Sequence, residues 1–262
     1  MNSTNQTYTV ITGASSGIGY AAAKAFAKRG KNLILIARRK ERLERLKEEL
    51  AALAPSAEVI LHPADCSVLK NVHQIYQELC PYPLETWINN AGFGNYETVA
   101  RQNLSEIETM LHLNVEALAV FSSLVVRDYH NVEGTQLINV SSAGGYTLVP
   151  TAIPYCASKF FVSAFTEGLA RELQESGSAM RAKVLAPAAT KTEFGKIAND
   201  TDSYNYDRLF GTYHTSEQMA DFLMQLYDSD QTVGLVDRET FAFQLSDPIF
   251  PYAGNSVHNQ KR

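Results

Sequence analysis

Short apolar runs alternate with longer segments of helical periodicity along most of the chain. The apolar runs are continuous rather than interrupted at every second residue, which is typical of strands buried on both faces of a sheet. Residues 40–53 show the helical pattern, because leucines recur there on one face and charged residues occupy the other. Seven strands are predicted, at residues 8–12, 32–37, 58–62, 86–90, 135–141, 182–187 and 240–245.

This alternation predicts an α/β fold in which right-handed crossovers build a doubly wound, mostly parallel sheet with helices on both faces. No segment rich in Pro, Gly or Ser divides the chain, so we expect residues 1–262 to form one domain. Residues 193–215 break the pattern, because they are polar and aromatic and long for a connection. Connections of this length are usually functional lids or disordered. We expect this one to be a substrate-binding loop.

Composition and charge narrow the range of partners. The chain has 262 residues, of which 45% are hydrophobic, enough for a sizeable core. Its net charge is −5 and no basic block stands out, which argues against a nucleic-acid surface and against a polybasic membrane contact. No apolar run reaches the ~18 residues of a membrane span. We therefore expect neither a nucleic-acid nor a membrane partner.

Cysteine and histidine usage bears on compartment and metal binding. The three cysteines, Cys66, Cys80 and Cys156, are an odd number, and the chain begins with the polar stretch "MNSTNQTYTV". Reduced thiols in a cytoplasmic protein are the simplest interpretation. Cys156 is either a redox-sensitive thiol or, more simply, a small core residue. The six histidines lack ligand spacing, so no metal site is expected.

The stretch "TGASSGIG" follows the first predicted strand and opens the first helix. Gly13, Gly17 and Gly19 allow a tight turn and a close approach of backbone to a pyrophosphate, with the N–H groups of the helix N-terminus directed at it. The alternative is a glycine-rich turn without a ligand. We predict a dinucleotide site, to which Ser15, Ser16 and Ile18 also contribute.

The end of the second predicted strand indicates which dinucleotide binds. A site for NAD usually carries an acid there, which bonds the ribose 2′-hydroxyl. This chain instead has Ala37 followed by Arg38 and Arg39, and guanidinium groups can bind a 2′-phosphate bidentately. NADP(H) is therefore favoured over NAD(H), with Arg38 as the first contact and Arg39 as the second. Alternatively, these residues are solvated charges that open the helix at Lys40.

A second group of residues suggests proton transfer. Tyr155 and Lys159 are four residues apart on a predicted helix, so they share one face. A nearby ammonium favours phenolate and can lower the pKa of a tyrosine by about 1–3 units, towards the range useful for acid–base catalysis. Ser142 lies just beyond a predicted strand, at the end where open α/β sheets place ligands. We predict that Ser142 and Tyr155 hold a carbonyl oxygen.

Four features in register resemble the short-chain dehydrogenase/reductase family from about residue 8 to residue 195. They are "TGASSGIG", "NNAG" at 89–92, "YCASK" at 155–159, and Ser142 thirteen residues before the tyrosine. The resemblance implies a Rossmann-type domain with strand order 3-2-1-4-5-6-7. It also implies an NADP(H)-dependent oxidoreductase acting on a small ketone, aldehyde or secondary alcohol. Members commonly form homodimers or homotetramers, so helix 105–130 and residues 160–165 are candidate contacts, although the latter could equally be core.

The resemblance assigns roles to particular residues. The catalytic residues it implies are Asn114, Ser142, Tyr155 and Lys159. Tyr155 would donate the proton, Lys159 would hold the ribose hydroxyls, and the Asn114 carbonyl would bind a proton-relaying water. Asn89 would steady the central strand. The remaining residues implied at the cofactor are Asp65, Asn90, Ala91, Gly92, Pro187 and Thr192. Ala188 replaces a glycine that is usual in the family.

The substrate stays open at this stage. A 3-hydroxyacyl or hydroxy-acid dehydrogenase of the same family is an alternative, and so is a non-catalytic NADP(H)-binding sensor. The tyrosines at 204, 206 and 213, with Phe210, could cap an apolar substrate or merely pack together. Pocket walls are expected from residues 93–94, 143–146, 187–189 and the 193–215 loop.

Overall fold

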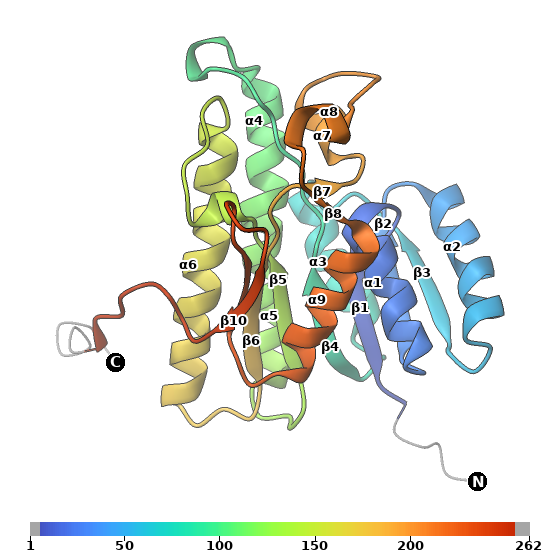
Figure 1. Ribbon diagram of the computed structural model, residues 1–262. Helices are drawn as coiled ribbons and strands as arrows, with labels where there is room; N and C mark the ends of the chain where they lie inside the picture. The colour runs from blue at the N-terminus through green and yellow to red at the C-terminus, as the bar shows by residue number, and fades with distance from the viewer. Residues whose placement is uncertain (1–5, 255–262) are drawn as a thin grey trace, which may run out of the picture.

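An eight-stranded sheet lies at the centre of the computed structural model, which describes residues 6–254 (Figure 1). Its strands are β1 (Tyr8–Thr12), β2 (Asn32–Ala37), β3 (Val59–Pro63), β4 (Leu84–Asn89), β5 (Gln136–Val140), β6 (Arg181–Ala186), β9 (Val233–Val236) and β10 (Phe243–Ser246). The order is β10-β9-β6-β5-β4-β1-β2-β3. Neighbouring strands are parallel except for β9 and β10. The predicted α/β Rossmann-type class is confirmed, and the two ends of the predicted 1–262 domain lie outside the described residues.

One strand was missed, and the predicted strand at 240–245 corresponds to β10 rather than to the seventh parallel strand. The parallel strand beside β6 is β9, a run of only four residues, and the chain near 240–245 instead forms β10, an antiparallel edge strand. Gly234 makes this hairpin possible, because a Cβ there would lie 2.9 Å from the ring of Phe243. The order 3-2-1-4-5-6-7 holds with β9 as the seventh strand, and β10 is an eighth.

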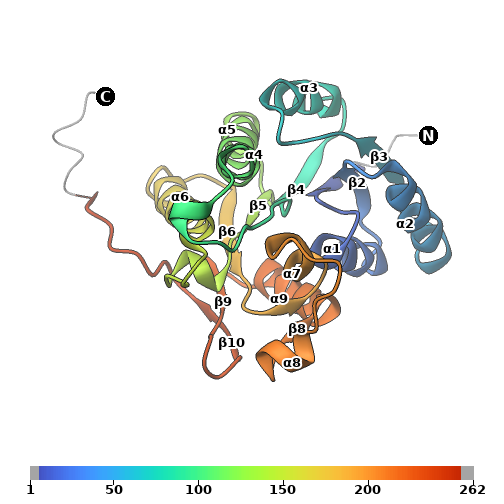
Figure 2. The same ribbon diagram turned by 90° about the horizontal axis from the view of Figure 1, so that it is seen from above.

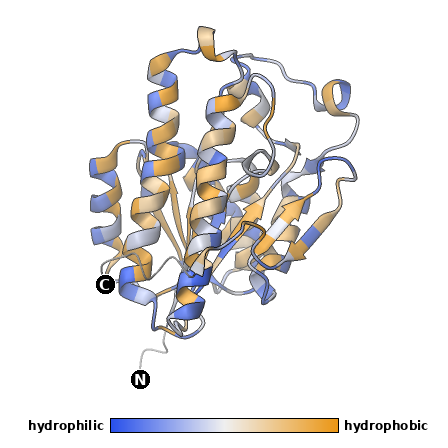
Figure 3. Ribbon diagram, turned by 90° about the vertical axis from the view of Figure 1, so that its left-hand side faces the viewer, coloured by the Kyte–Doolittle hydropathy of each residue, from blue (hydrophilic) through white to orange (hydrophobic). Residues whose placement is uncertain are grey.

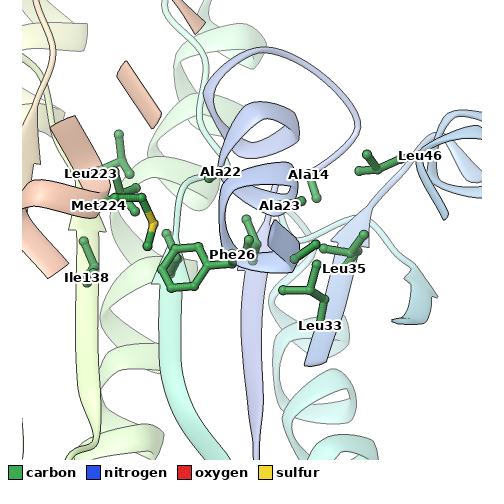
Figure 4. Close-up of a cluster of buried hydrophobic side chains, with 14 of the residues drawn as sticks. Ala14, Ala22, Ala23, Phe26, Leu33, Leu35, Leu46, Ile138, Leu223 and Met224 are labelled. Atoms are coloured by element: carbon green, nitrogen blue, oxygen red, sulfur yellow. The ribbon is translucent and has the colours of Figure 1, made fainter. Parts of the chain in front are cut away.

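Helices cover both faces of the sheet (Figure 2). One face carries α1 (Gly17–Lys28), α2 (Lys40–Leu53) and α9 (Ser216–Asp228), and the other carries α3 (Leu69–Leu79), α5 (Leu118–Tyr129) and α6 (Ile153–Glu175). On the first face, Phe26 of α1 packs with apolar side chains of β2 and α9 (Figure 4). On the second, Trp87 of β4 is fully buried, with its ring 4.9 Å from that of Phe121. Figure 3 shows the strands as an apolar layer between amphipathic helices.

A polar network ties the centre of the sheet to the second layer of helices. The Asn89 amide donates to the Asn139 side chain at 2.9 Å and to the Ser122 hydroxyl at 3.1 Å, and it accepts from the Trp87 indole at 2.8 Å. The Asn139 amide in turn donates to the Thr166 hydroxyl of α6 at 2.9 Å. Buried polar groups paired in this way specify one register of β4 and β5. This is the steadying role that the family resemblance implied for Asn89.

The helical stretch Leu104–Tyr129 consists of α4 (Leu104–Leu111), the π-helical turn η2 (His112–Ala117) and α5. It is long and apolar enough to cross a membrane on those two criteria alone, contrary to the expectation from its sequence. Its apolar residues have another explanation here, because Phe121 and Val125 are buried in the core beneath β4. The π-turn, a feature often found at functional sites, presents Asn114.

Residues 193–215 form two short helices, α7 (Phe194–Ala198) and α8 (Tyr206–Phe210), above the upper end of the sheet in Figure 1. Short strands β7 (Thr190–Lys191) and β8 (His214–Thr215) pair and close the base of this segment. The Tyr206 hydroxyl accepts from the Gly195 amide at 3.1 Å, and its ring lies 4.9 Å from that of Tyr204. The segment therefore has its own small aromatic core.

The buried carboxylate of Glu167, on α6, holds the last described part of the chain. It accepts from the amides of Ile249 and Phe250, at 2.5 and 2.8 Å, and from the Tyr146 hydroxyl at 2.5 Å. The rings of Tyr146 and Phe250 stack with centroids 5.3 Å apart. One carboxylate thus joins the C-terminal segment to the loop that follows β5.

Candidate active site

A cavity of about 560 Å³ opens where the parallel strands end. Its lining draws on the chain just beyond the last residue of each parallel strand: Gly13, Arg38, Asp65, Asn90, Ser142, Pro187 and Arg238. The crevice at the carboxyl ends of the strands is where open α/β sheets bind ligands. With the exception of Gly19 and Asn114, which lie beside it, all the predicted site residues line this cavity.

The glycine turn adopts a conformation that side chains would strain. Gly13 and Gly17 have φ of +69° and +56°, and a Cβ on Gly13 would lie 2.8 Å from the Cα of Ala91. The Thr12 hydroxyl accepts from the amides of both Asn90 and Ala91 at 3.0 Å. The turn and the "NNAG" segment are therefore built as one unit.

The N-terminus of α1 is prepared for an anion. Ser16 is its N-cap, yet the Ser16 hydroxyl accepts from Arg39 at 2.8 Å instead of capping the helix, and no acid lies in the first turn. The first N–H groups of the helix are thus left without side-chain partners, at the positive end of the helix dipole. This arrangement is what pyrophosphate binding requires.

Arg38 and Arg39 differ in how they are held. The Arg38 side chain is 67% exposed and its nearest carboxylate, Asp65, is 3.8 Å away. Arg39 makes four hydrogen bonds, two to Ser15, one to Ser16 and one to Glu193. Arg38 therefore keeps most of its donors free for a ligand, whereas Arg39 is largely engaged by the protein.

Ser142 and Tyr155 meet at the other end of the cavity. The Ser142 hydroxyl accepts from the Gly144 amide at 3.0 Å, which fixes the short turn after β5. Tyr155 lies near the start of α6 and is 7% exposed. Burial raises the pKa of its phenol well above the usual value, the nearby Tyr96 adds to that rise, and a hydrogen bond with Ser142 opposes it. The protein's own groups thus keep the proton on Tyr155.

Lys159 is 5% exposed, and its ammonium donates to the Val140 carbonyl at 2.9 Å. Burial lowers its pKa to about 8. The ammonium lies 5.9 Å from the centre of the Tyr155 ring, and the described residues show no hydrogen bond between the two side chains. The expectation that Lys159 lowers the pKa of Tyr155 is therefore wrong for the protein's own groups, because burial of the phenol is the larger effect.

Asn114 is held against the loop after β4. Its amide donates to the Phe93 carbonyl at 2.9 Å and to the Ser158 hydroxyl at 3.1 Å, while its oxygen accepts from the Phe93 amide at 3.2 Å. A Cβ on Gly92 would lie 3.0 Å from the Asn114 oxygen and 3.3 Å from the Lys159 ammonium. The glycine therefore lets the two predicted catalytic residues approach the end of β4.

The segment after β6 forms a further wall. The Pro187 carbonyl accepts from the Ala143 amide at 2.8 Å, and Ala188 is not among the described residues with positive φ, so alanine fits without strain. The Thr192 hydroxyl accepts from the Phe194 amide at 3.0 Å. The Thr192 methyl would lie 3.1 Å from a Cβ on Gly17, which brings this wall against the glycine turn.

Aromatic rings surround Tyr155. The rings of Phe194 and Tyr96 lie 5.3 and 6.4 Å from it, and Gly94 makes room for them, since a Cβ there would lie 2.7 Å from Phe194. Of the aromatic residues singled out in the sequence, three line the cavity: Tyr204, Tyr206 and Phe210. Tyr213 instead packs on Tyr206 at 5.5 Å.

Sequence reasoning missed Tyr96, Arg238 and Phe241 of this cavity, and it included Glu193 and Phe194 only as members of the 193–215 loop. Arg238 and Phe241 belong to the hairpin between β9 and β10, which was not predicted. The signal for Tyr96 was weak, although it lies four residues after Gly92 of the "NNAG" segment.

The cysteines differ in their burial. Cys156 is fully buried against Met110 and Ala152, so it is a core residue. Cys66 is buried, Cys80 is exposed, and all three thiols are free. Within residues 6–254 no group of three potential ligands is placed to hold a metal ion.

The comparisons with known proteins agree with this arrangement. The family model described as "short chain dehydrogenase" matches residues 7–203. The chain belongs to this family.

Relatives of this short-chain dehydrogenase span most of its length. Dehydrogenase/reductase SDR family member 11 of Gallus gallus is 27% identical and covers 87% of this chain and 92% of its own. A sulfoacetaldehyde reductase of Chromohalobacter salexigens is 35% identical, over 80% of this chain and 84% of its own. Among solved structures, a short-chain dehydrogenase from Sphingobium yanoikuyae in complex with NADPH has a TM-score of 0.79 and 28% identity, covering 87% and 86% of the two chains.

Proposed function

We propose that this short-chain dehydrogenase interconverts a ketone or aldehyde and the corresponding alcohol with NADP(H) as hydride carrier. The observation that carries the proposal is that one cavity joins the uncapped N-terminus of α1 and the free guanidinium of Arg38 to Ser142, Tyr155 and Lys159. An anion site and a proton donor at opposite ends of a cavity suit a dinucleotide that reacts at the end remote from its phosphates.

The residues present fit the phosphorylated dinucleotide. The wall carries Ala37 and the exposed Arg38 where a site for NAD would carry an acid. The related structure from Sphingobium yanoikuyae, which contains NADPH, supports the same choice. When bound, the cofactor supplies or accepts the hydride. Arg38 would hold the 2′-phosphate, and the first turn of α1 would hold the pyrophosphate.

The protein's own part in the reaction is to orient a carbonyl and to supply a proton. The Ser142 hydroxyl and the Tyr155 phenol would both donate hydrogen bonds to the carbonyl oxygen. As negative charge develops on that oxygen, the phenol transfers its proton. A raised pKa suits a proton donor, because the phenol remains protonated until an alkoxide, a much stronger base, forms beside it. The rings of Tyr96 and Phe194 exclude water from this end.

Lys159 and Asn114 would act behind Tyr155. The Lys159 ammonium, anchored on the Val140 carbonyl, lies where it can hold ribose hydroxyls and replace the proton lost by the phenol. Asn114 fixes the loop that carries Phe93 and, in the role implied by the family, would position a water for that transfer.

Steady-state oxidation of NADPH over a panel of ketones and aldehydes tests the proposal. Turnover with at least one carbonyl, and a larger thermal shift with NADPH than with NADH, are expected. Cofactor binding with no turnover across the panel would favour the alternative of a non-catalytic sensor, and equal shifts would contradict the preference for NADP(H).

Arg238 supports a second candidate, a carbonyl substrate that carries an anionic group. Its guanidinium lies on the wall shared with Tyr96, where it acts against the rise that burial causes in the pKa of that tyrosine. Oxo acids, the carbonyl forms of hydroxy acids, carry such a group. Sulfoacetaldehyde, named for the relative that is 35% identical, also does.

We also propose that the chain self-associates. Phe161 on α6 is 36% exposed and stacks on Phe165, with ring centroids 5.6 Å apart, so α6 offers an apolar outward patch. Leu104 and Leu111 of α4 are exposed as well. Light scattering after size-exclusion chromatography should give a dimer or tetramer, and a monomer at micromolar concentration would contradict this. The cytoplasmic location stays a prediction.

A further inference from the structure

Two arginines bind the carboxylate of Glu193, the residue at which the 193–215 segment begins. The Arg39 guanidinium donates to one carboxylate oxygen at 2.8 Å, and the Arg42 guanidinium donates to the other at 2.6 Å. Side chains of all three are close to 40% exposed. Two guanidinium groups that converge on one carboxylate form an anion site, and an acid of the protein itself fills it.

This anion site lies at the adenosine end of the cavity. Arg39 directly follows Arg38 at the end of β2, and both line the cavity together with Glu193. Arg39 also donates to the hydroxyls of Ser15 and Ser16 in the glycine turn, at 3.1 and 2.8 Å. Glu193 is therefore bound beside the glycine turn and the end of β2, the two elements that would receive the phosphates.

We propose that Glu193 is an internal anion that competes with the ribose 2′-phosphate for Arg39 and Arg42. The proposal rests on the proposed function in that it takes the cavity to bind a nicotinamide dinucleotide. Under it, Glu193 weakens the binding of NADP(H) without affecting NAD(H), which has no 2′-phosphate. Arg42, in the first turn of α2, becomes a further phosphate ligand that no sequence motif indicated.

The competition follows from charge. A phosphate near Arg39 would lie close to the Glu193 carboxylate, and two anions that share one pair of guanidiniums repel each other. Burial works against ionisation of Glu193, but the hydrogen bonds from Arg42 and Arg39 outweigh it and keep its pKa below the usual value. The carboxylate is thus charged at neutral pH, and a bound 2′-phosphate would displace it.

Displacement of Glu193 would be felt at the substrate end. Glu193 is the N-cap of α7, and the next residue, Phe194, packs its ring 5.3 Å from that of Tyr155. The 2′-phosphate would therefore release Glu193, the residue directly before the Phe194 ring that covers the phenol. NADP(H), but not NAD(H), would loosen α7.

The substitution Glu193→Gln tests this, because it removes the charge and keeps the size. Dissociation constants for NADPH and NADH are measured by fluorescence titration at one ionic strength. The constant for NADPH should fall by about three- to tenfold, as expected for loss of a partly exposed competing ion pair, and that for NADH should stay within about twofold. The matched control is Glu44→Gln, which removes a charge from α2 where, within residues 6–254, Glu44 pairs only with Lys40. It should change neither constant by more than about twofold.

Weaker NADPH binding by Glu193→Gln would overturn the proposal, since Glu193 would then be positioning the arginines. Equal changes for both cofactors would also overturn it. If the wild-type chain binds neither cofactor, the proposed function fails instead. If the variant does not fold, a measurement on the wild-type chain still tests the proposal. Amide exchange at residues 193–199 should be faster with saturating NADPH than with saturating NADH, and equal exchange would count against the competition.

Discussion

The side-chain amide of Asn114 pairs with the backbone of Phe93 through two hydrogen bonds, donating to its carbonyl at 2.9 Å and accepting from its amide at 3.2 Å. Asn114 occupies the π-turn of a long helix, and Phe93 follows the "NNAG" segment. One amide therefore sets the distance between the helix layer and the loop beside the proposed cofactor.

Replacing Asn114 by Asp should disrupt this pair. The carboxylate would place an acceptor opposite the Phe93 carbonyl, and a buried acceptor left without a donor costs about 1–3 kcal/mol. We expect the free energy of unfolding measured in urea to fall by about that amount, with a lower kcat as well. Wild-type stability in Asn114→Asp would show that the pairing is unimportant.

Tyr155→Phe removes the proposed proton donor and keeps the ring. We expect kcat to fall by about 10³-fold, within the range for loss of acid–base catalysis, with the dissociation constant of NADPH nearly unchanged. Stopped turnover with intact binding is the diagnostic combination. Tyr96→Phe is the matched control, because its ring lines the same cavity and touches Tyr155. It should retain most of the activity, and an active Tyr155→Phe variant would refute the mechanism.

The pH dependence should report Lys159. Burial lowers its pKa to about 8, so the ammonium loses its proton as the pH rises through that value. If its charge and proton serve carbonyl reduction, kcat/KM for reduction should be level below about pH 8 and fall by up to about tenfold per pH unit above it. The Lys159→Arg variant, in which the side chain stays charged, should not show this fall in kcat/KM above pH 8, even if the activity of the variant is low. A wild-type profile that stays level to pH 10 would argue against this role.

Lys183 of β6 is buried, and its ammonium donates to three carbonyls at the end of α9, those of Leu226, Tyr227 and Ser229, at 2.6 to 2.9 Å. Lys183→Met should lower the free energy of unfolding by about 2–4 kcal/mol, because these carbonyls lose their donor. The NADPH dissociation constant should not change. Lys191→Met, at an exposed lysine, should stay within about 0.5 kcal/mol of wild type in the same urea titration. Equal midpoints for the two variants would contradict the role of Lys183.

Arg238→Ala tests the second candidate function. If the guanidinium anchors an anionic group, kcat/KM should fall by about 10- to 100-fold for a carbonyl bearing a carboxylate or sulfonate, and little for a neutral ketone of similar size. Arg208→Ala on α8 is the control, because Arg208 is exposed and does not line the cavity. Equal losses on both substrates would remove Arg238 from any role in selectivity.

Features that depend on a few neighbouring residues, such as the glycine turn and the apolar strands, could be predicted from the sequence. Gly13 and Gly17 need positive φ within a few residues of an apolar strand, so the turn and its helix could be recognised from a short stretch. The first six strands were found because each contains a short apolar run, although in β3 only Val59 is buried. β9 was missed because it has four residues and includes a glycine, and its place depends on pairing with β6 nearly fifty residues earlier. Because β9 was not predicted, Arg238, which follows it, was not recognised as a cavity residue.

The electrostatics of the site depended on contacts that spacing cannot show. Tyr155 and Lys159 share a helix face as predicted. The ammonium nevertheless binds the Val140 carbonyl, and burial is the main influence on the pKa of the phenol. Likewise, Glu193 is about 150 residues from the arginines that hold it, so no local pattern pairs them.

The capture of the Ile249 and Phe250 amides by Glu167 has a practical consequence for handling the protein. A protease that clips the last described residues, or a fusion that pulls on them, would leave a buried carboxylate without two of its donors and would loosen Tyr146 in the loop beside Ser142. Affinity tags are therefore safer at the amino end. Mass spectrometry should show whether a preparation has lost residues at the carboxyl end before low activity is attributed to a wrong choice of substrate.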